Sequence, residues 1–154
     1  MNCLPYISPS NVRSTGRLGD WYANIHHFSR LQLVLAVSER TLLPVVLRAK
    51  DVASLPEFLP PAVGEVLAAI GVPTREIDLE LAEMNQVLFA KTASRQVLGS
   101  MNDFAYQLEG YLQDSGSLLE LALKVGEAPM GPLGMQDPIS ATQAAFTMPS
   151  PRLI

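Results

Sequence analysis

The chain has 154 residues, a formal net charge of −4 and 48% apolar residues, values typical of one folded domain. Only 17% of the residues are charged, which excludes the low hydrophobicity and high charge of a disordered chain. The negative charge argues against a dedicated nucleic-acid-binding protein, because phosphate backbones are bound mainly by clustered Lys and Arg. The single cysteine, Cys3, fits a reducing compartment. Without a secretory signal or an apolar run long enough to cross a bilayer, we expect a cytoplasmic protein with no membrane partner.

Three short runs near the start predict sequential, largely antiparallel strands at residues 21–28, 31–37 and 42–47. They follow a loop at residues 8–20 that is rich in Ser, Pro, Asn and Gly. The middle run carries apolar residues at almost every position, so we expect it to be the central strand.

Helical periodicity begins with Leu59 and continues to Ile70, and the Pro60-Pro61 pair suits a first helical turn. Gly71 and Pro73 are expected to end this helix. Residues 76–84 fit both a strand and a helix, and we favour a short helix. Residues 86–91 form an apolar run that predicts a further strand joining the sheet.

A long helix is expected over residues 94–113, although a capping box at Ser100 to Asp103 allows a start at Ser100 instead. A second capping box at Ser117 predicts a short helix that ends at Gly126. Residues 128–154 are rich in Pro, Met and Gly and predict an irregular or mobile tail, with one helical turn near 141–146. The predicted organisation is one α+β domain over residues 1–127, a mostly antiparallel sheet of four to five strands packed against three to four helices, followed by this tail.

No motif predicts a metal, a cofactor or a catalytic residue. His26 and His27 are neighbours on a strand, so their side chains point to opposite faces and do not chelate one ion together. Cys3 has no base beside it in the sequence, and the glycines at 16 and 19 form no phosphate-binding loop. The acidic run over residues 76–83 is typical of a solvated helix face.

Polar residues gather near the ends of the predicted elements, where binding sites usually lie. An arginine pair, Arg40 and Arg95, would hold an anionic group, with Trp21 as a stacking wall. The candidate ligand-binding residues are Asp20, Trp21, Asn24, Arg40, Thr41, Thr92, Arg95, Asn102 and Asp103. The same residue types also form ordinary caps and turns, so the pattern alone does not decide between a site and structural roles.

Three segments of the chain stand out: GDWYANI at residues 19–25, SERTLLPVVL at residues 38–47 and KTASRQVLGSMNDFA at residues 91–105. Together they resemble a family of small bacterial domains of unknown function. The chain departs from the family pattern at Ser38 and Gln96, where the family often has Asn and Ser. The resemblance implies a shared α+β fold and a shared set of polar residues, and it implies no activity.

Two functional hypotheses follow. The first is a non-enzymatic protein-interaction domain of the bacterial accessory gene pool, such as a defence, plasmid or integron cassette product, which binds a protein partner or a second copy of itself as a homodimer. The alternative is an enzyme or small-ligand receptor that binds an anionic group through Arg40 and Arg95, with Asp20 or Asp103 as a general base.

Overall fold

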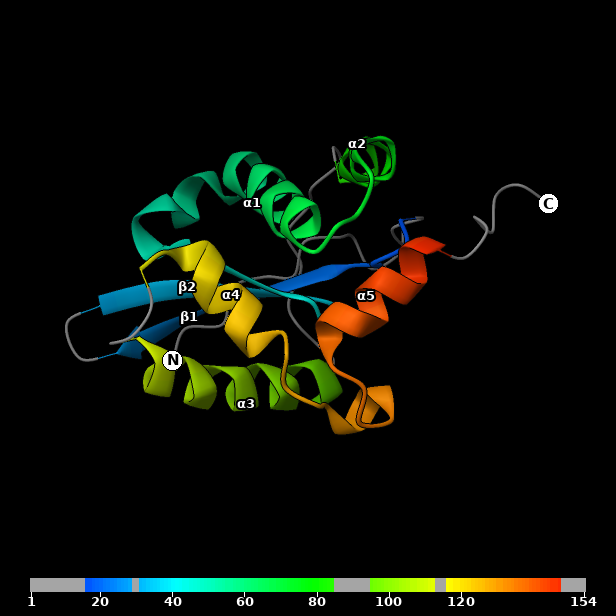
Figure 1. Cartoon of the computed structure of the whole chain (residues 1–154). Helices are drawn as coiled ribbons and strands as arrows, with labels where there is room; N and C mark the ends of the chain where they lie inside the picture. Colours follow the sequence, from blue (N-terminus) through cyan, green and yellow to red (C-terminus); the bar gives the residue numbers. More distant parts are fainter. Residues whose placement is uncertain (1–15, 29–30, 85–94, 113–115, 148–154) are drawn as a thin grey trace.

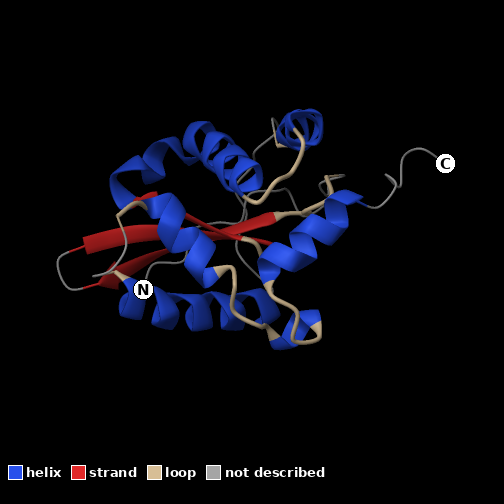
Figure 2. Cartoon of the chain, in the orientation of Figure 1, coloured by secondary structure: helices blue, strands red, loops and turns tan. Residues whose placement is uncertain are grey.

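The computed structural model of the chain describes residues 16–28, 31–84, 95–112 and 116–147, without the side chains of residues 51–53, 95 and 96. These residues form a three-stranded antiparallel sheet and five α-helices (Figures 1 and 2). The predicted α+β class is therefore confirmed. The described part has fewer strands and more helices than we expected, and the strand predicted at residues 86–91 lies outside it.

The sheet has the order β1-β2-β3. Its strands are β1 (Trp21–Phe28), β2 (Leu31–Ser38) and β3 (Pro44–Arg48). Trp21 pairs with Ser38 in the first ladder, and Val37 pairs with Pro44 in the second. Strand β2 is central, as its apolar sequence predicts, and its residues from Leu33 onward are buried.

Helices cover both faces of the sheet. Figure 1 shows α1 (Leu55–Ala69) and α2 (Thr74–Glu83) on one side and α3 (Arg95–Tyr111) on the other. Helix α4 (Leu118–Val125) packs against β3, α1 and α3, so it connects the two layers beside β3. The short 3-10 helix η1 (Ala49–Ser54) joins β3 to α1. No helix in the described ranges is long and apolar enough to span a membrane.

The start of α1 differs from our prediction. The helix begins at Leu55 and not at Pro60, and Pro56 occupies its first turn, where a missing N–H leaves no hydrogen bond unmade. Leu55 and Leu59 are both buried and lie four residues apart, so the apolar stripe begins one turn earlier than the run that we recognised. The predicted end is confirmed, and Gly71 has a φ of +92° just beyond it.

The structure also decides between strand and helix for residues 76–84, and between the two possible starts of α3. Residues 76–83 are helical within α2, and α3 is already helical at Arg95, so Ser100 lies inside a continuous helix. Ser117 caps α4, as predicted, by accepting a 3.1 Å hydrogen bond from the N–H of Glu120. The Glu120 carboxylate accepts from the N–H of Gly116, one residue before the position that a capping box predicts.

The segment after residue 127 is more regular than we predicted where the structure describes it, and the predicted helical turn near residues 141–146 lies within a longer helix. The 3-10 helix η2 (Gly131–Leu133) and helix α5 (Pro138–Thr147) form there. The buried residues of α5 are Pro138, Thr142 and Phe146, spaced four apart. Pro138 and Thr142 are not ordinary apolar helix formers. The face of α5 that packs on the domain therefore shows little apolar periodicity in the sequence.

Candidate functional site

The loop before β1 and the turn after β2 are joined by hydrogen bonds. The N–H of Glu39 donates to the carbonyl of Asp20 at 2.8 Å, and the N–H of Arg40 donates to the carbonyl of Leu18 at 3.1 Å. The Arg40 guanidinium also donates to the carbonyl of Gly16 at 3.0 Å. Two of the sequence segments that carry the family resemblance therefore meet at this junction and hold the backbone together.

Four of the nine predicted site residues lie at this junction. Asp20, Trp21 and Thr41 are buried, and Arg40 is exposed on the turn. Asn24 lies farther along β1, and because it is three residues from Trp21 its side chain points to the opposite face of the sheet. Its amide nitrogen lies 3.9 Å from the sulfur of Met101 in α3.

The remaining predicted residues do not complete an anion site in the described part of the chain. Asn102 and Asp103 are exposed on α3, while Thr92 and the side chain of Arg95 lie outside the description. The predicted arginine pair therefore stays a prediction.

Strand β1 carries buried polar atoms with no hydrogen-bond partner in the part of the chain that the structure describes: Trp21 Nε1, Asn24 Oδ1 and His26 Nε2. Burial lowers the pKa of His26, and the neighbouring charge of His27 lowers it further. The ring is therefore neutral near pH 7. Within the described ranges, no group of three or more His, Cys, Asp or Glu side chains is placed to hold a metal ion.

Glu80 of α2 is a buried carboxyl that ends beneath the loop before β1. It accepts hydrogen bonds from the N–H of Arg17 at 2.7 Å and from the N–H of Leu18 at 3.3 Å. Burial raises the pKa of Glu80, although these two donors act in the opposite direction. Glu80 thus fixes α2 to the junction, and we assign it a structural role.

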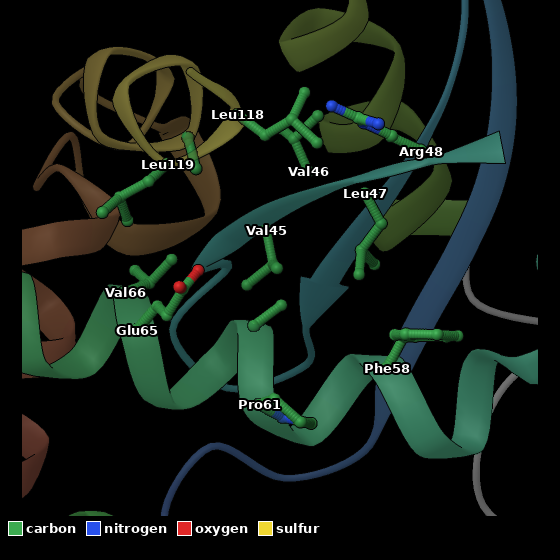
Figure 3. Close-up of a pocket in the computed structure, with 12 residues that line it drawn as sticks. Val45, Val46, Leu47, Arg48, Phe58, Pro61, Glu65, Val66, Leu118 and Leu119 are labelled. Carbon is green, nitrogen blue, oxygen red and sulfur yellow. The ribbon is translucent and has the colours of Figure 1, made fainter. Parts of the chain in front are cut away.

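A groove of about 300 Å³ lies beside β3, between α1 and α4 (Figure 3). Its floor is the strand itself, from Val45 to Arg48. One wall comes from α1 and the other from α4, and their lining residues are Phe58, Pro61, Ala62, Glu65, Val66, Leu118, Leu119 and Ala122. The lining is apolar except for Arg48 and Glu65.

The backbone at the floor of this groove has hydrogen-bonding groups that no described residue uses. The N–H of Ser38 donates to the carbonyl of Leu43, and antiparallel ladders alternate between bonded and non-bonded pairs. Val45 is therefore a bonded partner of Ala36, whereas Val46, opposite Leu35, directs its N–H and C=O away from β2. Neither group of Val46 has a hydrogen-bond partner among the described residues.

Two exposed side chains border the groove near the end of β3. Phe58 is 45% exposed, which is unusual for a large apolar side chain. Arg48 is exposed and forms no ion pair within the described part of the chain. The groove therefore offers apolar contact area, a strand edge at which Val46 has no backbone partner among the described residues, and two charged side chains, Glu65 and Arg48.

A second, more open hollow of about 790 Å³ adjoins the groove and shares Arg48 and Leu118 with it. Its other lining residues are Leu31, Gln32, Leu33, Ala49, Lys50, Leu112, Gly116, Ser117 and Leu121. Leucines from the sheet, from the end of α3 and from α4 thus line the hollow, and Arg48 and Lys50 lie at its rim.

None of these groove residues was among the sites that we predicted from the sequence. The available signal was Pro44, because a proline in a strand confines that strand to the edge of a sheet. The strand that we predicted at residues 42–47 is present as β3 but spans Pro44–Arg48, and the prediction did not identify it as an edge strand.

Comparison with known proteins gives one match. No curated protein matches the chain, and no solved structure matches it. The sequence profile of the family described as Domain of unknown function (DUF6933) matches residues 2–141, nearly the whole chain. This confirms the resemblance drawn from the three motifs, and the chain belongs to the DUF6933 family.

Proposed function

We propose that this protein is a protein-interaction domain that binds an extended, apolar segment of a partner protein along the free edge of β3. The observation that carries the proposal is that the N–H and C=O of Val46, at the floor of an apolar groove, point away from β2 and have no partner among the described residues. An extended peptide satisfies such groups by adding a strand to the sheet.

The edge favours a short bound segment. Pro44 has no N–H, so the residues of β3 whose N–H groups point away from β2 are Val46 and Arg48. A volume of about 300 Å³ holds only a few residues of extended chain. We therefore expect affinity to depend on a few main-chain bonds together with side chains that pack against Phe58 and Leu119.

The positive charge of Arg48 favours a partner segment that carries a negative charge. Arg48 has no acidic partner among the described residues, so a carboxylate on the bound segment would pair with it. The partner segment that fits best is short, extended and apolar, with a negative charge at the Arg48 end.

The test is an affinity selection of octapeptides from a random solution library, with bound peptides identified by mass spectrometry. Val46→Pro removes the N–H at the edge, and Val46→Ala trims the side chain but keeps that N–H. We expect Val46→Pro to weaken the selected peptides about tenfold or more relative to Val46→Ala, a difference of about 1.4 kcal/mol.

Phe58→Ser tests the apolar wall, and Tyr106→Ser is its control, since Tyr106 is 82% exposed on α3 and does not line the groove. Phe58→Ser should weaken binding and Tyr106→Ser should not. Selected peptides that bind Val46→Pro and Phe58→Ser as tightly as the unmodified protein would refute the proposal. A homodimer that these two variants dissociate would instead identify a second copy of the chain as the occupant.

A further inference from the structure

The groove beside β3 and the adjoining hollow form one continuous surface, because Arg48 and Leu118 line both. Strand β3 runs from Pro44 toward Arg48, so the hollow begins where the strand ends. A segment that lies along β3 and continues in the same direction therefore arrives at Arg48 and at the leucines beyond it.

The hollow combines an apolar interior with two positive charges. Leu33 is buried, while Leu31 is 46% exposed toward solvent. Arg48 and Lys50 are both exposed, and neither has a carboxylate partner within the described ranges. The chain has 11 Lys and Arg against 15 Asp and Glu, so two cations on one rim with no carboxylate partner in the described ranges form a local positive charge that would attract a negative group.

We propose that the segment bound along β3 is the C-terminus of the partner protein, and that its last residue is a large apolar one. This inference rests on the proposed function. The final side chain enters the leucine-lined hollow, and the terminal carboxylate pairs with Arg48 and Lys50. The bound segment runs parallel to β3, because its carboxyl end lies at the Arg48 end of the strand.

A chain terminus fits this surface better than an internal acidic residue. The terminal residue carries an apolar side chain and a carboxylate on the same Cα, which matches a hollow where leucines and cations are adjacent. An Asp or Glu side chain supplies the charge but leaves the leucines exposed to water.

The experiment uses two octapeptide libraries that differ only at the C-terminus, one with free carboxylates and one with carboxamides. Peptides selected from the first library are resynthesised in both forms and measured by fluorescence anisotropy. We expect the free acid to bind about tenfold or more tightly than the amide, the scale of one charge-assisted hydrogen bond. We also expect selected peptides to end in Leu, Ile, Met or Phe.

Arg48→Gln combined with Lys50→Gln should abolish the preference for the free acid. Arg75→Gln should preserve it, because Arg75 is an exposed cation on α2 that lines neither hollow. Equal binding of acid and amide that still depends on Val46 would overturn this inference and leave the proposed function standing. An acid preference that survives the double substitution would also overturn it, and failure to select any peptide from either library would overturn both proposals.

Discussion

The hydroxyl of Thr142 in α5 donates a 2.9 Å hydrogen bond to the hydroxyl of Thr41 in the turn between β2 and β3. Thr41 lies 3.0 Å from the hydroxyl of Ser38, which accepts from the N–H of Leu43 at 3.0 Å. Thr41 accepts from Thr142 and also shares a hydrogen bond with Ser38, in which either hydroxyl can be the donor. All three side chains are buried, so this chain of hydroxyls fastens the last described helix to the β2–β3 turn.

The middle hydroxyl should matter most for stability. Thr41→Val leaves the buried hydroxyl of Thr142 without an acceptor, and we expect it to lower the free energy of unfolding by about 2 kcal/mol. Thr142→Val removes one bond without stranding a donor and should cost about 1 kcal/mol. Urea unfolding of both variants checks the order. Thr147→Val is the control, because Thr147 is exposed and bonds only to Ala144 in its own helix. Equal costs for Thr41→Val and Thr142→Val would contradict this account.

The buried Glu80 should make stability fall as the pH rises. Burial raises its pKa in the folded protein above 4.5, the ordinary value. Between 4.5 and the raised pKa, the unfolded chain has released a proton that the folded protein still holds, so the free energy of unfolding decreases as pH increases through this window. We expect Glu80→Gln to remove this slope, and urea unfolding from pH 4.5 to 7.5 measures it.

The control for this prediction is Glu57→Gln, which makes the same change at an exposed carboxyl of α1. The free energy of unfolding of Glu80→Gln, relative to that of the unmodified protein, should increase with rising pH. The same difference for Glu57→Gln should show no such increase. A stability difference for Glu80→Gln that is the same at every pH would show that Glu80 does not titrate differently on folding.

His26 should act with the opposite sign. Its pKa is lowered from 6.5, first by burial and then by His27. Below pH 6.5 the unfolded chain binds a proton that the folded protein resists, so the free energy of unfolding falls as the pH drops through this range. His26→Leu should reduce that slope, whereas His27→Gln should keep most of it, since His27 is exposed. An NMR titration in which the His26 ring protonates at pH 6.5 or above would contradict the prediction.

Local patterns predicted much of the fold. The three strands, the end of α1, the helix at residues 76–84 and the cap at Ser117 all follow from periodicity and turn chemistry in neighbouring residues. Only one turn of α5 was predicted, because the buried side of this helix includes Pro138 and Thr142, and their packing depends on residues far away in the sequence. Thr142 is buried because Thr41 accepts its hydrogen bond across 101 positions, and no sequence window contains both.

The candidate groove was less accessible to sequence reasoning than the fold. Polar residues near element ends are visible in a sequence, but whether they converge depends on strand register, and Trp21 and Asn24 prove to lie on opposite faces of β1. The groove instead depends on which edge of β3 is unpaired and on which helices border it. In the sequence, Leu118 and Phe58 look like ordinary helix positions. Only the placement of α1 and α4 on either side of β3 brings them to the same groove.

A comparison of alanine substitutions at Gly19 and Gly71 tests the contact between two family motifs, the segment that begins at Gly19 and the turn that carries Arg40. Both have positive φ, +77° and +92°, so alanine at either site carries a backbone cost of about 1 kcal/mol. A Cβ at Gly71 meets nothing within 4 Å, whereas one at Gly19 lies 3.0 Å from Cγ of Arg40. Gly19→Ala should therefore cost about 1 kcal/mol more than Gly71→Ala, because Arg40 must move and its bond to Gly16 weakens.

Urea unfolding of the two variants measures this difference, and Gly110→Ala in α3 is the control, since it has no positive φ and no atom within 4 Å of the added Cβ. Alanine replaces glycine there in an ordinary helix, so we expect it to stabilise the protein by about 0.5 kcal/mol. If Gly19→Ala and Gly71→Ala cost the same, Arg40 leaves its position freely. The hydrogen bond from Arg40 to Gly16 then contributes little, and Arg40 is available for the anion-binding role predicted from the sequence.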